Sequence, residues 1–171
     1  MSDAKKFFGK YRGLVVDNVD PMQTARLLVQ VPDVSNVLPS SWAMPCVPFG
    51  GIQSGCFAVP DIGSPVWVEF EQGNPDYPVW TGSFWETAAD VPALALAAPP
   101  GLQQVVVQTI GQNTLVISDV PGPTGGILLK STTGALISIS DIGITISNGQ
   151  GASIVMTGPA VTINEGALEV I

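Results

Sequence analysis

Glu69 and Glu71 are the pair of residues whose type and spacing best suit catalysis. On an extended strand two residues apart they would share one face, about 7 Å from each other. Paired carboxylates at such distances perform acid and base steps on glycosidic bonds. A solvated strand face is the favoured explanation of the pair, and a cell-wall hydrolase that uses Glu69 and Glu71 stays an alternative.

The absence of histidine excludes much other chemistry. Without it there is no Ser-His-Asp triad, no Cys-His dyad and no histidine-ligated metal site. The two cysteines, Cys46 and Cys56, are too few for a four-cysteine zinc site. A disulfide between them stays open, but free buried thiols are favoured. We therefore predict no catalytic residue, no metal site and no cofactor, and hence no enzyme.

Aromatic residues are the second set that could bind a ligand, by stacking on bases or sugars. Trp67, however, alternates with Val66 and Val68, which is typical of a core or interface strand. An oligosaccharide-binding or single-strand-binding module is thus a second alternative. The formal net charge of −8 argues against the nucleic acid. The set comprises Trp42, Trp67, Trp80, Trp85, Phe49, Phe57 and Phe84.

Charge is unevenly distributed along the 171 residues. Five of the six basic residues precede residue 27, and Lys130 is the only cation after it, against eleven acids. The basic end is a candidate docking site. No apolar run reaches the roughly 18 residues of a membrane span, and the N-terminus lacks an apolar signal region. We expect synthesis in the cytoplasm without a signal peptide.

The chain divides into four segments by pattern. Residues 1–9 form an N-terminal arm. Residues 10–87 alternate between short β-like runs and tight turns, with a long interruption at 34–56, and predict a small barrel, first of all an OB-fold. Residues 88–101 are an Ala/Pro-rich linker with a turn of helix. Residues 102–171 hold five charges and no aromatic residue.

Apolar residues of this last segment come in pairs two residues apart, which predicts strands with one apolar face. Gly, Asn or Asp separates the pairs, as in a degenerate strand repeat. The pairs are Leu115/Ile117, Ile127/Leu129, Ile137/Ile139, Ile144/Ile146, Ile154/Met156, Val161/Ile163 and Leu168/Val170.

Strands this short enclose too little for a core within one chain. Three intertwined chains, each forming one side of a triangular prism with strand edges paired between chains, would bury the apolar faces. The alternative is a sandwich extension within one chain. In the trimer, the core would be filled by Ile137, Ile139, Ile144, Ile146, Ile154, Met156, Val161 and Ile163.

The N-terminal motifs resemble those of a known family over about 75 residues. The chain is similar to the OB domain of phage baseplate assembly protein V and of the VgrG spikes of type VI secretion and related contractile injection systems. Residues 102–171 resemble the family's trimeric β-helix needle by architecture. The motifs are Tyr11-Arg12-Gly13-Leu14-Val15, Asn18-Val19-Asp20-Pro21, Arg26 to Pro32, Trp42-Ala43-Met44-Pro45, Pro60 to Glu71, Gly73-Asn74-Pro75 and Pro78 to Gly82.

The resemblance implies an all-β, homotrimeric central spike in the baseplate of a virion or phage-tail-like injection particle. It links the tube hub to a tip protein with Pro-Ala-Ala-Arg repeats and punctures the target envelope on sheath contraction, touching the membrane only transiently. Residues 88–101 are too short for the lysozyme domain that some relatives insert. We expect the blunt end at Leu168, Val170 and Ile171 to meet the tip. We expect the hub contact at Lys5, Lys6, Lys10 and Arg12.

Overall fold

The computed structural model describes residues 5–170, without the burial of Gly166 and without the side chains of Glu169 and Val170. The chain separates into two compact units, one ending at Glu86 and one beginning at Thr87. Both are built from strands, and the one α-helix among the described residues, α1 (Pro32–Ser35), has four residues. No helix within this described part is long and apolar enough to cross a membrane.

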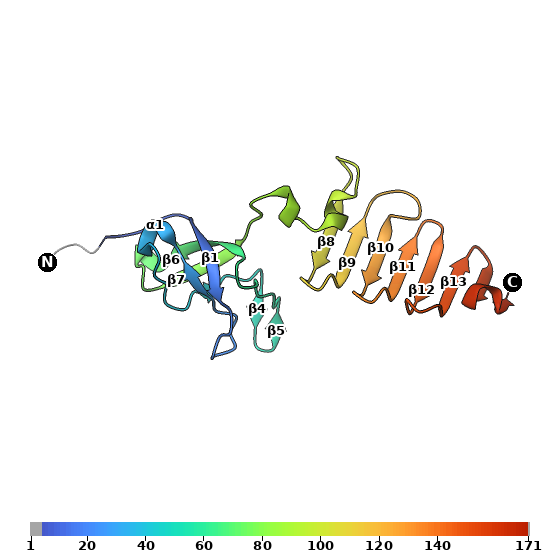
Figure 1. The fold of residues 1–171 in the computed structure, drawn as a ribbon, viewed down its shortest axis with the longest axis horizontal. Helices are drawn as coiled ribbons and strands as arrows, with labels where there is room; N and C mark the ends of the chain where they lie inside the picture. The colour runs from blue at the N-terminus through green and yellow to red at the C-terminus, as the bar shows by residue number, and fades with distance from the viewer. Residues whose placement is uncertain (1–4, 171) are drawn as a thin grey trace. The chain divides into compact units, whose positions relative to one another are not determined.

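The first unit is a five-stranded sheet in the order β2-β1-β6-β7-β3, with a separate hairpin, β4–β5 (Figure 1). Its central strands pair antiparallel, and β3 runs parallel to β7. The strands are β1 (Tyr11–Asp17), β2 (Leu28–Gln30), β3 (Met44–Pro45), β4 (Gly50–Gly51), β5 (Ser54–Gly55), β6 (Pro65–Phe70) and β7 (Pro78–Ser83).

The core of this unit follows from alternation along the strands. In β6, Val66, Val68 and Phe70 point inward and are buried, while Trp67 points to the opposite face. Successive side chains of a strand point to opposite sides of the sheet, so one face is buried in the core and the other is turned toward the solvent. Phe7 also packs into this core and donates its N–H to the Gly73 carbonyl, so the expected N-terminal arm is partly built into the unit.

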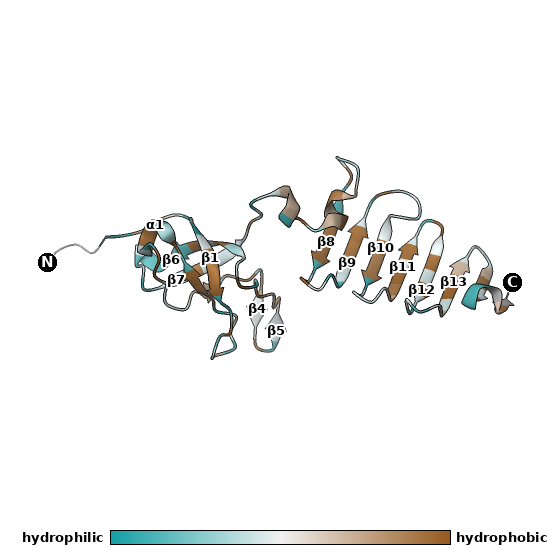
Figure 2. Cartoon of the chain, viewed as in Figure 1, coloured by the Kyte–Doolittle hydropathy of each residue, from teal (hydrophilic) through white to brown (hydrophobic). Residues whose placement is uncertain are grey.

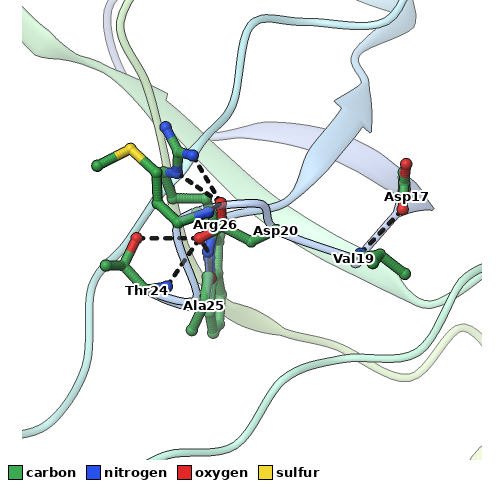
Figure 3. A network of polar contacts seen from close by, with 8 residues as sticks. Asp17, Val19, Asp20, Thr24, Ala25 and Arg26 are labelled. Atoms are coloured by element: carbon green, nitrogen blue, oxygen red, sulfur yellow. Dashed lines mark hydrogen bonds and ion pairs between the residues drawn. The ribbon is translucent and has the colours of Figure 1, made fainter.

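A buried ion pair fixes the turn between β1 and β2 (Figure 3). The Asp20 side chain is 3% exposed and accepts six hydrogen bonds from Met22, Thr24 and Arg26. The Arg26 Nη2–Asp20 Oδ1 distance is 2.6 Å. The hydrogen bond from Arg26, with those from the backbone, holds the pKa of the Asp20 carboxyl far below its ordinary value despite burial. The turn is therefore built around a permanent carboxylate.

Replacing Asp20 with Asn is expected to lower the melting temperature at neutral pH. The amide keeps the shape of the side chain but leaves the Arg26 guanidinium without its counter-ion. The unfolded chain protonates Asp20 near pH 3.9, whereas the folded chain does so at much lower pH, so the stabilisation is full above about pH 5 and declines as the pH falls below about 4. Melting temperatures of both proteins between pH 7 and 2.5 should differ by a constant amount down to about pH 5 and approach each other only below about pH 4. A gap that stays constant to pH 2.5 would contradict this assignment.

The second unit is one antiparallel sheet of eight strands in sequence order (Figure 1). Before it, the 3₁₀ turns η2 (Ala88–Asp90) and η3 (Ala93–Leu96) occupy much of the expected linker, and Gln104 Nε2 donates to the Leu94 carbonyl. The strands are β8 (Gln104–Gln108), β9 (Thr114–Ser118), β10 (Gly126–Lys130), β11 (Leu136–Ser140), β12 (Gly143–Ser147), β13 (Ser153–Thr157), β14 (Ala160–Ile163) and β15 (Leu168–Val170), with η4 (Asn164–Gly166) before the last.

The hydrogen bonding of this sheet corrects the expectation that strand edges pair between chains. Each of β9 to β14 pairs with its sequence neighbours on both edges within the same chain. Strand edges are thus not paired between chains along these six strands, because short hairpin turns close each strand on the next. Copies of the chain can meet along these strands only through side chains.

Candidate functional site

One face of the C-terminal sheet carries two straight columns of apolar residues. Antiparallel register places the two apolar residues of each strand directly opposite those of the next. Eight strands at about 4.8 Å spacing make the columns about 34 Å long. By register, one column is Val105, Ile117, Ile127, Ile139, Ile144, Met156, Val161 and Val170. The other is Val107, Leu115, Leu129, Ile137, Ile146, Ile154, Ile163 and Leu168.

This apolar face is open in the single chain. Ile139 is 42% exposed and Ile146 40%, although both lie in central strands. Figure 2 shows the apolar residues concentrated in the strands, with hydrophilic residues in the turns. Among the described residues of the second unit, all eight strands belong to this one sheet, so the unit has no second sheet to cover the face, which contradicts the sandwich alternative. A continuous exposed apolar surface of this size marks an interaction site.

The opposite face is mostly polar over its C-terminal half. The residues between the two columns there are Ser138, Thr145, Val155 and Thr162, in β11 to β14. Nearer β8 this face is more apolar, and Val116 is buried there at 6% exposure. Cross-strand hydrogen bonds from Thr114 to Gln108 and from Ser118 to Gln104 cover it. The sheet therefore presents one continuously apolar face and one face that is mostly polar toward its C-terminal end.

The residues expected in the trimer core all belong to the two columns. Sequence reasoning noticed all of the column pairs except Val105/Val107, because three consecutive valines at 105–107 hide the period of two. Of the residues expected at the tip, Leu168 lies in β15 and is 55% exposed. The Val170 side chain and Ile171 lie outside the described residues, so the tip assignment stays a prediction.

The residues expected at the hub differ in their surroundings. Lys10 Nζ lies 2.8 Å from Glu69 Oε1 and donates to Thr81 Oγ1. The Arg12 guanidinium lies over the tilted, neighbouring rings of Trp67 and Phe84, 5.8 and 5.3 Å from their centroids. Lys5 lies over the Phe7 ring, and Lys6 is exposed. All four lie in the first unit, and their contact with a hub stays a prediction.

The glutamate pair does not have the geometry expected of it. Strand β6 ends at Phe70, and Glu71 begins a 3₁₀ turn, η1 (Glu71–Gly73), so only Glu69 lies within the strand. Glu69 is also engaged by Lys10. The strand ends early because the tight turn at 71–76 must reverse the chain into β7.

The cysteines correct one further expectation, and the aromatic residues divide between core and surface. Cys46 and Cys56 are free, but exposed rather than buried, because the segment around them has no second layer packed on it. Trp80 is a core residue, and its Nε1–H donates to the Ala25 carbonyl. Trp85 is 64% exposed. No group of three or more His, Cys, Asp or Glu in the described part of the chain could hold a metal ion.

Two protein-family models match the chain, one in each of its two units. The model described as the type VI secretion system/phage-baseplate injector OB domain matches residues 11–85. The model described as the phage baseplate V C-terminal trimerisation domain matches residues 104–169. No curated protein matches the chain. Both matched domains are structural rather than enzymatic families, and the second supports a homotrimer. With an OB domain followed by a trimerisation domain, the chain belongs to the phage baseplate V family of baseplate spike proteins.

Proposed function

We propose that this chain is the central spike of a contractile phage-tail-like particle. Three copies associate through the apolar columns. The basic N-terminal region, with Lys5, Lys6, Lys10 and Arg12, binds a separate hub protein. The end near Leu168, Val170 and Ile171 carries a Pro-Ala-Ala-Arg tip protein. Sheath contraction then drives the spike through the target envelope, and it acts mechanically, without catalysis.

The open apolar face of β8 to β15 is the observation that carries this proposal. Three such sheets, turned inward, would bury about 34 Å of paired columns around one axis. Isoleucine, leucine and valine fill such a core without leaving a polar group unpaired. The polar face is then turned to the solvent. Since each sheet is hydrogen-bonded along its length, bending the prism would break many strand pairs together, which gives a spike its stiffness.

The solution mass tests the assembly. Light scattering on the full chain is expected to give about 53 kDa, three copies of a 17.7 kDa chain. A truncation ending at residue 100, which removes all the strands of the second unit, should lose or weaken the trimer. A full chain at 17.7 kDa would overturn the prism and return attention to the OB unit as a ligand-binding module.

Removal of β14 and β15 tests the link to the tip. A chain ending at Thr157 keeps six strands of the apolar face and is expected to stay trimeric. It should lose the tip protein, since the proposed docking residues are gone. Affinity purification from assembled particles, followed by mass spectrometry, measures this directly. Retention of the tip by the truncated chain would place its docking site elsewhere.

A further inference from the structure

The hairpin β4–β5 is an apolar projection on the first unit. Its strands, Gly50–Gly51 and Ser54–Gly55, pair only with each other (Figure 1). Ile52 at the tip is 98% exposed, and Phe49 and Phe57 at the base are 63% and 74% exposed. An isolated two-stranded hairpin is marginally stable in water, so this one gains from a partner.

The segment around the hairpin has the composition of an interface core. Residues 34–60 contain no Lys, Arg, Asp or Glu. Charged residues are depleted, and aromatic residues enriched, where a protein surface is fully buried by a partner. A partner recognised by charge would find nothing here to pair with. The hairpin therefore suits an apolar, shape-matched acceptor.

An acceptor of this kind lies on the same unit, at the base of the hairpin. It is a groove of about 580 Å³, open to solvent, whose walls come from the chain before the hairpin, the chain after it, and the end of β7. The segment that contains β3 runs beside β7 as far as Cys46, whose N–H donates to the Trp80 carbonyl. Beyond Cys46 this segment moves away from β7, and the groove begins at that point. The groove is lined mainly by Val47, Pro48, Ala58, Val59, Pro60 and Trp80.

Hairpin and groove cannot fill each other within one chain, because the hairpin rises from the rim of the groove. We propose that the hairpin tip of one copy inserts into the groove of the next copy in the homotrimer. Such a contact is head-to-tail, and three-fold symmetry closes it into a ring that leaves no hairpin and no groove empty. The trimerisation domain of the same chain holds the three OB units at high local concentration, so a modest contact area suffices. The inference rests on the proposed homotrimer.

Disulfide trapping in the full chain tests the contact, because Cys46 lines the groove. The variant Ile52→Cys/Cys56→Ser places one thiol on the tip and keeps one in the groove. With oxidised glutathione it is expected to form a covalent trimer on a non-reducing gel, and no larger species. Disulfides form only where Cα atoms approach within about 7 Å, so a distant pair is not captured.

Two control variants fix the meaning of the result. Val37→Cys/Cys56→Ser carries its added thiol on another exposed segment and should stay monomeric on the gel. Ile52→Cys/Cys46→Ser/Cys56→Ser lacks the groove thiol and should give no cross-link. A covalent dimer of this variant would mean that two hairpin tips meet each other, and it would overturn the proposal. Light scattering on reduced Ile52→Cys/Cys56→Ser separates the two hypotheses. A mass of about 53 kDa without covalent trimer overturns the hairpin contact alone, and 17.7 kDa overturns the homotrimer as well.

Discussion

A chain carrying Ile139→Asp is expected to run as a monomer, with its mass falling from about 53 to 17.7 kDa. Ile139 lies in β11 at the middle of one apolar column, between Ile127 and Ile144. It is 42% exposed in the single chain, so a carboxylate there is still hydrated before assembly. In the prism, three such carboxylates would be brought together without counter-ions, and each buried, unpaired charge costs several kcal/mol.

Ser138→Asp is the matched control for this variant. It adds the same charge one residue earlier in the same strand, but on the opposite face of the sheet. That face is turned to solvent in the proposed trimer, so the mass should stay near 53 kDa, three copies of the chain. Light scattering at matched concentrations compares the two variants. If Ser138→Asp dissociates and Ile139→Asp does not, the faces are assigned the wrong way round.

The C-terminal sheet could be predicted from the sequence to an unusual extent. Its apolar pairs recur with a period of two and are separated by turn residues, so each pair from Leu115/Ile117 onward marks one strand. The strand with three consecutive valines was missed, since alternation is not visible where every residue is apolar. Pairing within the chain was also missed, because periodicity along a strand carries no information about which chain supplies its neighbour.

The OB unit was predictable where sequence patterns are local. Strands β1, β6 and β7 follow from alternation between turn signals. The segment 34–56 was not, since β3 is held by the distant strand β7, and the two-residue strands of the β4–β5 hairpin lie in a glycine-rich sequence of low strand preference. The exposure of Cys46 and Cys56 was not predictable either, because it depends on which other parts of the fold pack over them. Glu71 was misplaced because the end of a strand is set by the turn that follows it.

Glycine at position 126 decides whether β10 and β11 can pair. Gly126 has φ +81°, and a Cβ there would fall on the backbone carbonyl of Ile139, far inside van der Waals contact. A backbone atom cannot rotate away as a side chain can, so Gly126→Ala must separate the strands at this end or twist the turn before them. The expected loss of stability is more than about 3 kcal/mol, the sum of backbone strain and a disrupted strand pair. Since the apolar columns require this register, the trimer should weaken as well.

Gly122→Ala separates the effect of space from that of backbone conformation. Gly122 lies in the same turn region, with φ +86°, almost the value at Gly126, but a Cβ there meets nothing within 4 Å. Both variants are therefore destabilised by the same backbone strain, about 1–2 kcal/mol for an L-residue in a left-handed conformation. Only in Gly126→Ala does the new Cβ also clash with the Ile139 carbonyl. Denaturant unfolding measures the two losses. Because the stability of a trimer depends on protein concentration, both variants are compared at the same concentration. The free energy of unfolding of Gly126→Ala should be well below that of Gly122→Ala. Equal losses would mean that β10 and β11 are not held in this register in the assembled protein, and the straight apolar columns would then have to be redrawn.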